Sequence, residues 1–201
     1  WIEDQQGTQK EKISLLKKIC TKEKITNFYD LGANYGEFSA ALSSKVTNIF
    51  SFEPNPNVYA CLEETKKLYS NIKTYNQAVG IIESKQKFYY NKRYSGGGRL
   101  SEWTWNDKRY QHFNNPEFYD FKNVQVIKFL DFFNKTNNKE PCLIKIDIEG
   151  AETKIIKDLS DTLKLLPKWF IFFESDKSSD LKQLPGQLLF KQDHDLLIGK
   201  I

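Results

Sequence analysis

The sequence predicts a doubly wound α/β fold, in which helices cover both faces of a mainly parallel sheet. Three observations support this prediction. Short apolar runs alternate with helical patterns along the chain. A turn with two glycines, G-x-x-x-G, separates the apolar run 26–31 from a helical segment at 37–44. The run 169–173 is apolar without alternation, as expected for a strand that is covered on both faces.

The expected elements follow in chain order. An amphipathic helix at 10–20 belongs to an N-terminal helical segment, 1–24, and would cover one edge of the sheet. Asn55-Pro56 is a good start signal for a helix at 56–69. The remaining elements are strands at 26–31, 48–53, 72–77, 142–147 and 169–173, extra strands or strand extensions at 87–91 and 124–129, a helix at 151–159, and a closing antiparallel hairpin at 188–190 and 196–198.

Composition is typical of one enzyme domain spanning residues 1–201. No apolar run approaches the roughly 20 residues of a membrane helix, and the formal charge of +4 is too evenly spread to favour nucleic acid. Three cysteines indicate reduced thiols and a cytoplasmic location, and no Cys/His cluster has the spacing of a metal site. The chain begins with Trp1 and contains no methionine, so we expect a segment excised from a longer protein.

The glycine turn and its flanking acids indicate a nucleoside ligand without a phosphate. The turn Gly32–Gly36 lacks the G-x-G-x-x-G pattern of dinucleotide folds and the Lys-Ser/Thr pair of a P-loop. Asp30 would repel a phosphate but attract an ammonium group, and Glu53 ends the next strand, where it can accept hydrogen bonds from a ribose diol. This combination predicts S-adenosylmethionine. The glycines could instead merely turn the chain, and Glu53 could merely cap the following helix.

Four segments together resemble the FkbM family of S-adenosylmethionine-dependent methyltransferases. They are DLGANYGEFS at 30–39, FEPNP at 52–56, NQAV at 76–79 and KIDIEGAE at 145–152. The resemblance covers about 26–175, and the stretch 92–122 looks individual to this chain. It implies a Rossmann-like class I methyltransferase fold and O-methylation of sugars, glycolipids or polyketide-type products.

Strand position and the resemblance together predict the cofactor site. Glu53 would bind the ribose, the residues after the third strand would border the adenine, and the glycine turn with Asn34 would face the methionine part. The predicted cofactor-binding residues are Asp30, Gly32, Asn34, Gly36, Glu53, Pro54, Asn55, Gln77, Ala78 and Asp147.

Methyl transfer to a hydroxyl requires a group that takes up the hydroxyl proton. Asp147 at the end of the fourth strand is the first candidate, Glu149 is the second, and His112 is an alternative base. Asp147 or Glu149 could instead bind the acceptor or steady the sulfonium, and spacing does not separate these roles. Glu152 begins the next helix, where a capping role is favoured.

The stretch 92–122 is the expected acceptor site or lid. It combines a glycine-rich loop with aromatic and cationic residues, which suit a sugar but also resemble single-strand nucleic-acid binding or a small satellite core. The predicted substrate-binding residues are Arg99, Trp103, Trp105, Tyr110 and Glu174.

These observations predict an O-methyltransferase that acts on a glycan, glycolipid or polysaccharide, for example at a deoxyhexose such as rhamnose or fucose. We expect a saccharide or glycolipid acceptor, no nucleic-acid partner, and fusion to other domains such as glycosyltransferases. The alternatives are a methyltransferase for RNA or a small natural product, and a non-catalytic domain that keeps the cofactor fold. A nicotinamide oxidoreductase is disfavoured, because its glycine pattern is missing.

Overall fold

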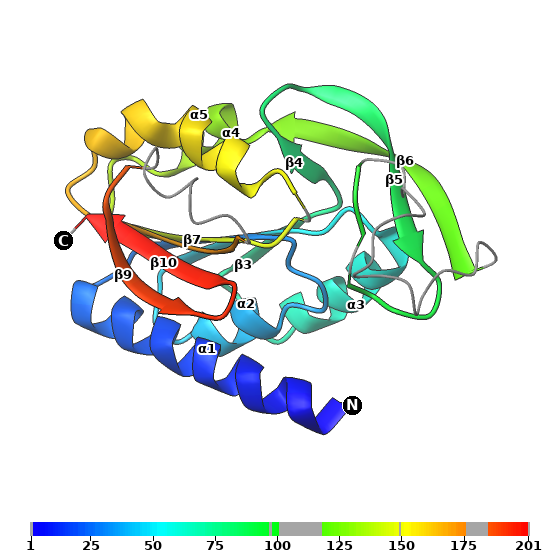
Figure 1. Ribbon diagram of the computed structural model, residues 1–201, viewed down its shortest axis with the longest axis horizontal. Coiled ribbons are helices and arrows are strands. Elements are labelled where there is room, and N and C mark those ends of the chain that lie inside the picture. Colours follow the sequence, from blue (N-terminus) through cyan, green and yellow to red (C-terminus); the bar gives the residue numbers. More distant parts are fainter. Residues whose placement is uncertain (1, 97, 101–117, 149, 176–184, 201) are drawn as a thin grey trace.

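The computed structural model describes residues 2–96, 98–100, 118–148, 150–175 and 185–200, and side chains from residue 9 onward. A seven-stranded sheet lies between two layers of helices, and a separate three-stranded sheet stands at one end of it (Figure 1). The predicted fold class is therefore confirmed. No helix among the described residues is long and apolar enough to cross a membrane.

The large sheet has the strand order β3-β2-β1-β7-β8-β10-β9. The first five strands in this order are parallel, and β10 and β9 form the expected antiparallel hairpin beside β8. The order in which strands are added reverses between β1 and β7, since β2 and β3 lie on one side of β1 whereas β7 and β8 lie on the other, and ligands bind at such a switch point. The strands are β1 (Asn27–Leu31), β2 (Asn48–Phe52), β3 (Ile72–Tyr75), β7 (Cys142–Ile146), β8 (Trp169–Glu174), β9 (Gln187–Gln192) and β10 (Asp195–Lys200).

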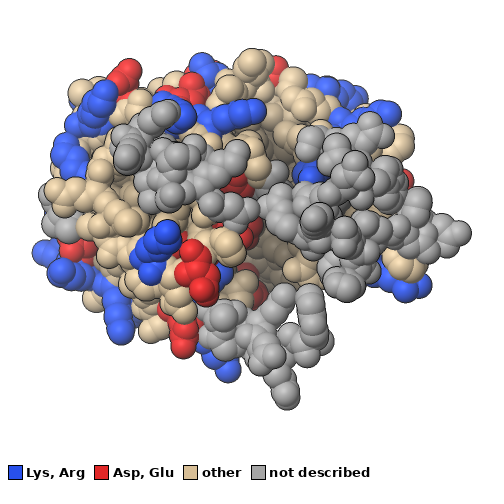
Figure 2. Space-filling view, in the orientation of Figure 1, with Lys and Arg blue, Asp and Glu red and all other residues tan. Residues whose placement is uncertain are grey.

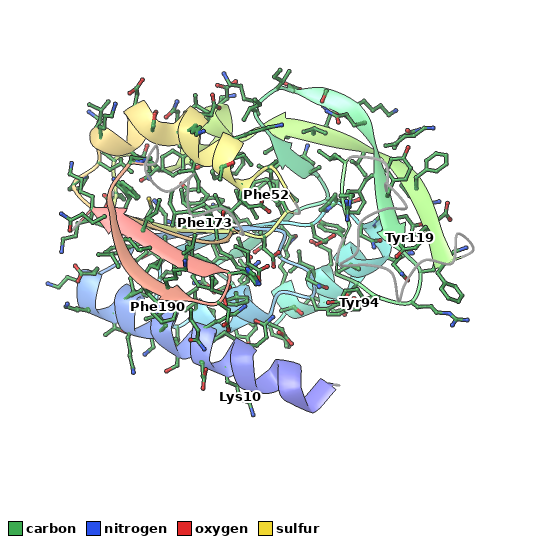
Figure 3. The ribbon with its side chains drawn as sticks, viewed as in Figure 1. Lys10, Phe52, Tyr94, Tyr119, Phe173 and Phe190 are labelled. Atoms are coloured by element: carbon green, nitrogen blue, oxygen red, sulfur yellow. The ribbon has the colours of Figure 1, made fainter. Side chains whose placement is uncertain are left out.

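The first helical layer consists of α1 (Ile2–Glu23), α2 (Glu37–Leu42) and α3 (Pro56–Lys66). Helix α1 is longer than predicted and buries Leu16 and Cys20 against this face of the sheet. Figure 3 shows how α1 faces the sheet: Phe190 of β9 lies toward α1, whereas Lys10 of α1 points away from the body of the molecule. Helix α3 begins as predicted, at Pro56.

The second helical layer consists of α4 (Phe129–Thr136) and α5 (Glu152–Lys164). Helix α4 was not predicted, whereas the strand expected at 124–129 is present as the end of β6 (Tyr119–Lys128) and overlaps α4 only at Phe129. Phe129 and Phe133 are one helical turn apart, and both rings pack on Tyr29 of β1, at centroid distances of 5.7 and 5.1 Å. In Figure 3, Phe52 and Phe173 fill the space between the sheet and this layer.

The three-stranded sheet has the order β4-β6-β5. Its strands are β4 (Ala78–Gly80), β5 (Ser84–Asn91) and β6 (Tyr119–Lys128). Two predictions need correction here: the third strand ends at Tyr75, with Ala78 already in this second sheet, and residues 119–122 of the expected lid belong to β6. Residues 101–117 of that lid lie outside the described residues.

Candidate functional site

A cleft of about 310 Å³ opens at the carboxyl ends of β1, β2 and β7 and extends beneath the three-stranded sheet. On the face of the molecule drawn in Figure 2, acidic side chains lie inside a hollow near the middle, whereas most Lys and Arg side chains lie toward the periphery. The cleft is lined by Gly32, Asn34, Phe52, Glu53, Pro54, Gln77, Ala78, Val79, Gln86, Phe88, Ser95, Gly96, Gly98, Leu100, Asp147, Ile148, Gly150, Ala151 and Lys154.

The glycine turn packs directly against the end of β7. A Cβ atom on Gly32 would lie 1.9 Å from the carbonyl oxygen of Asp147, and Gly32 has φ +80°. The turn is held to β2 as well, since the N–H groups of Gly32 and Ala33 donate to the Phe52 carbonyl at 3.0 and 2.8 Å. Only glycine meets both the close approach and the left-handed backbone. The turn therefore forms one wall of the cleft at a fixed distance from Asp147.

Glu53 lies at the end of β2 with its carboxyl group held by backbone donors. The N–H of Asn34 donates to Oε2 at 3.0 Å, and the N–H of Asn55 donates to Oε1 at 2.8 Å. Burial raises the pKa of Glu53 to about 7, although these two N–H groups act to lower it. Each carboxyl oxygen has a further lone pair, so the group can accept hydrogen bonds from two hydroxyls of a ligand in the cleft.

Asp147 follows β7 and presents its carboxylate to the same cleft. Its backbone N–H donates to the Leu31 carbonyl at 3.0 Å, which continues the β1–β7 pairing past the strand end. The side chain is 49% exposed, so a ligand can reach it. Its Oδ2 atom lies 3.4 Å from the ammonium of Lys145. Asp147 and Glu53 are thus the two carboxyl groups that line the described cleft.

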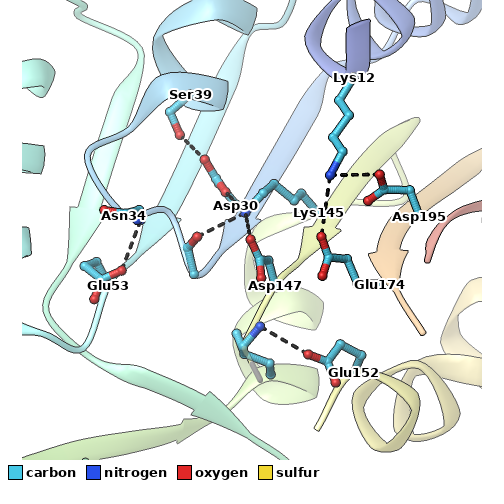
Figure 4. A network of polar contacts seen from close by, with 12 residues as sticks. Lys12, Asp30, Asn34, Ser39, Glu53, Lys145, Asp147, Glu152, Glu174 and Asp195 are labelled. Atoms are coloured by element: carbon cyan, nitrogen blue, oxygen red, sulfur yellow. Dashed lines mark hydrogen bonds and ion pairs between the residues drawn. The ribbon is translucent and has the colours of Figure 1, made fainter. Parts of the chain in front are cut away.

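A buried polar network lies under the glycine turn (Figure 4). Asp30 accepts a hydrogen bond from Ser39 of α2 at 2.6 Å, and Ser39 in turn contacts Ser51 of β2 at 2.8 Å. Lys145 donates to the Gly32 carbonyl at 3.0 Å and lies 3.4 Å from Asp30 Oδ1. The sequence analysis missed Lys145, Ser39 and Ser51. A lysine inside the otherwise apolar strand CLIKI was the available signal.

Three predicted cofactor residues do not line the cleft. Asp30 is fully buried, and the ammonium near its carboxylate belongs to Lys145 rather than to a ligand. Gly36 lies where α2 approaches α3, since a Cβ atom there would come within 2.7 Å of Leu62. Asn55 caps α3 through its side chain and donates its N–H to Glu53, which is a supporting position. The cap of α3 is thus Asn55 and not Glu53.

Two predicted substrate residues also lie away from the cleft. Arg99 pairs with Tyr89 of β5 through the backbone, while the neighbours of Arg99 line the cleft. Glu174 lies 3.5 Å from Lys12 of α1 and lines a second hollow of about 30 Å³, which shares Asp147 with the main cleft. Burial and the nearby charge of Asp147 raise the pKa of Glu174.

Five predicted residues cannot be placed. Glu149, His112, Trp103, Trp105 and Tyr110 lie outside the described residues.

Several described cleft residues were not predicted. Gln86 and Phe88 lie two residues apart on β5 and both line the cleft, so they share one face of the strand, which the period-two pattern could have indicated. Lys154 comes from the first turn of α5. The loop before α5 is shaped by Glu152, which accepts a hydrogen bond from the Gly150 N–H at 2.9 Å. Glu152 begins α5 as expected, but its side chain bonds this loop, and the N-cap residue, Ala151, makes no side-chain cap hydrogen bond.

The strand order, the antiparallel β10 beside β8, and the cleft at the switch between β1 and β7 define a class I, Rossmann-like methyltransferase fold. Comparison with known proteins identifies the family. The methyltransferase FkbM domain matches residues 30–196, and the chain belongs to this family.

Individual relatives share only low sequence identity with this chain. Methyltransferase 1 of Beauveria bassiana (strain ARSEF 2860) is 25% identical over 144 residues, which cover 66% of this chain and 57% of the relative. The crystal structure of methyltransferase FkbM from Methylobacillus flagellatus KT superposes with a TM-score of 0.56 at 17% identity, covering 88% of this chain and 44% of that one. TrmK of M. capricolum, solved with S-adenosylhomocysteine, superposes with a TM-score of 0.43 at 12% identity, covering 94% of this chain and 66% of that one. The chain thus spans about half the length of the first two relatives.

Proposed function

We propose that this chain transfers the methyl group of S-adenosylmethionine to a hydroxyl group of a sugar. One observation carries the proposal: Glu53, which suits a ribose diol, and Asp147, which suits an acceptor hydroxyl, line the same cleft. Membership of the methyltransferase family supports the reaction type. The identity of the acceptor as a sugar is part of the proposal.

The cleft residues suggest how the cofactor is held. Glu53 accepts hydrogen bonds from the ribose hydroxyls, and Gln77 and Ala78 border the adenine. Gly32 and Asn34 face the methionine part. Asn34 supports this assignment, because its Oδ1 atom is buried at the cleft without a hydrogen-bond partner among the described residues. A ligand ammonium or hydroxyl group would satisfy that oxygen.

The chemistry is a displacement at the methyl carbon. The acceptor oxygen forms a bond to the methyl carbon, the bond from that carbon to the sulfonium sulfur breaks, and the sulfur keeps the electron pair as a neutral thioether. Asp147 takes up the proton of the acceptor hydroxyl. The chain contributes by aligning the two reactants and by placing this carboxylate within reach.

The described part of the cleft favours an uncharged acceptor. Its outer wall combines the amides and hydroxyls of Gln86 and Ser95 with the apolar surfaces of Phe88 and Leu100. Lys154 is the one cationic residue among the described lining residues. Nucleic-acid sites contact several phosphates through Lys and Arg, so this composition supports a sugar rather than RNA.

The proposal extends to the longer protein of which this chain would be one domain. We include fusion to further domains, such as glycosyltransferases, in the proposal, because the matched region covers 57% of one relative and 44% of the other. A cytoplasmic location is also part of the proposal. It is supported by the three cysteines, which are free in the structure.

Transfer of a labelled methyl group from S-adenosylmethionine to a panel of saccharides, glycolipids and RNA tests the proposal. We expect label in a saccharide or glycolipid. Asp147→Asn should lower turnover by a factor on the order of 10² to 10⁴, typical of a lost general base, and should change S-adenosylhomocysteine affinity much less. Label in RNA alone, or normal turnover by Asp147→Asn, would contradict the acceptor or the base assignment respectively.

A further inference from the structure

Lys145 connects three segments that meet at the cleft. Its side chain is 5% exposed and points from the centre of the sheet toward the end of β1. Its Nζ atom lies 3.0 Å from the Gly32 carbonyl, 3.4 Å from Asp30 Oδ1 and 3.4 Å from Asp147 Oδ2 (Figure 4). An ammonium group has three donors, and these three acceptors belong to β1, to the glycine turn and to the end of β7.

Lys145 remains charged in spite of its position. Burial lowers the pKa of a lysine, but the charges of Asp30 and Asp147 outweigh burial here and raise the pKa of Lys145 above its ordinary value. The Phe38 ring lies 5.1 Å from the ammonium and closes it off from the α2 side. Asp30 is itself fixed by its hydrogen bond from Ser39. The ammonium group of Lys145 is therefore fixed by Asp30 and lies against the Asp147 carboxylate.

We propose that Lys145 is a positioning residue for methyl transfer, which fixes the carboxylate of Asp147 and the carbonyl of Gly32 relative to each other. Asp147 could otherwise adopt several side-chain rotamers, since half of its side chain is exposed. With Oδ2 held by Lys145, Oδ1 is the oxygen left to receive the acceptor proton. This inference rests on the role proposed above for Asp147.

The contacts of Lys145 also explain why a charged side chain occupies the middle of the sheet. A buried ion pair by itself contributes little net stability, because both groups lose their hydration. Asp30 and Lys145 could be replaced by neutral residues without leaving a buried charge behind. If the pair served stability alone, such a replacement would leave turnover unchanged.

The test is the paired variant Asp30→Asn/Lys145→Met, with Lys168→Met as the control. Lys168 also pairs with a buried carboxylate, Glu23, at 2.6 Å, but it precedes β8 at the opposite end of the strands from the cleft. The paired variant avoids the unpaired Asp30 charge that Lys145→Met alone would leave buried. Thermal unfolding of each variant shows that it is folded before activity is compared.

We expect the paired variant to lower turnover ten- to a hundred-fold on the saccharide identified with the wild type, while S-adenosylhomocysteine affinity changes less than five-fold. Lys168→Met should match the wild type in both. Wild-type turnover in the paired variant would overturn the inference. A loss of affinity equal to the loss of turnover would also overturn it, because it would indicate damage to the cofactor site.

A crystal structure of the paired variant with S-adenosylhomocysteine gives a readout that does not depend on the acceptor. We expect the Asp147 carboxylate to leave its wild-type rotamer. An unchanged rotamer would overturn the inference even if the wild type methylates a sugar. A displaced carboxylate in a protein that methylates no saccharide would instead support the positioning role and reject the proposed acceptor.

Discussion

The carboxyl group of Glu53 is nearly excluded from water, and two backbone N–H groups only partly offset that burial. Its pKa is raised from 4.5 to about 7. A carboxyl group with a raised pKa in the folded state contributes stability below pH 4.5, and that contribution is lost as the pH rises through about 7. A ribose diol donates hydrogen bonds, so it favours the ionised form.

Cofactor affinity should therefore depend on pH in the opposite sense to the stability of the free protein. Between pH 8 and pH 6, S-adenosylhomocysteine affinity should fall by about tenfold, since Glu53 becomes mostly protonated. Glu53→Gln should bind more weakly at pH 8, by about 1.5 to 3 kcal/mol, the range for hydrogen bonds to charged groups. Titration calorimetry at several pH values measures both effects. A Gln variant that keeps the wild-type pH slope would show that another group titrates.

At the scale of residues, the sequence indicated the cleft acids but not their supports. Glu53 and Asp147 follow strands, and that position alone suggested a role at the sheet edge. Asp30 also stands at a strand end, yet its side chain points under the turn to Lys145. Successive side chains of a strand point to opposite faces, but β1 is buried along its whole length, so its local pattern does not show which face carries the site.

The backbone of the glycine turn lies in close contact with the end of β7 at Gly32. Gly32 and Gly150 both have positive φ, +80° and +105°, but of the two only Gly32 is crowded, since no described residue lies within 4 Å of a Cβ atom on Gly150. Gly150→Ala should thus lose about 1–2 kcal/mol of stability from backbone strain. Gly32→Ala should lose more and should also lose cofactor binding, because the turn must move away from Asp147.

Urea unfolding and calorimetric titration of S-adenosylhomocysteine compare the two variants. Equal losses of stability, or normal cofactor binding by Gly32→Ala, would contradict the proposed rigid contact between the turn and β7.

At the scale of elements, long and strongly patterned segments were predictable and sheet membership was not. The apolar spacing of α1 and the Asn55-Pro56 start of α3 are local signals, and both helices are present. Helix α4 was missed because the apolar residues of β6 run directly into Phe129, without a glycine or proline between the two elements. The change of sheet between Tyr75 and Ala78 depends on distant pairing with β6, which the local sequence does not contain.

For the whole molecule, ligand binding should be visible as thermal stabilisation. A ligand at a hundred times its dissociation constant contributes about 2.7 kcal/mol, which for a chain of 201 residues corresponds to a rise in Tm of about 5–10 °C. We expect this rise with S-adenosylhomocysteine. NAD and ATP should leave Tm unchanged, because the turn lacks a phosphate-binding pattern. A rise with NAD alone would contradict the cofactor assignment.

Cys142 begins β7 at the centre of the large sheet, where burial raises the pKa of its thiol to about 12. At neutral pH this sulfur is neither accessible nor a thiolate, so an alkylating reagent reaches it only when the central strands separate. Cys61 on α3 is exposed and should be alkylated at once. The rate at which iodoacetamide labels Cys142 should therefore report how often the strand that carries Lys145 opens, with the fast labelling of Cys61 as the reference. A bound nucleoside cofactor should lower the labelling rate of Cys142 without affecting that of Cys61.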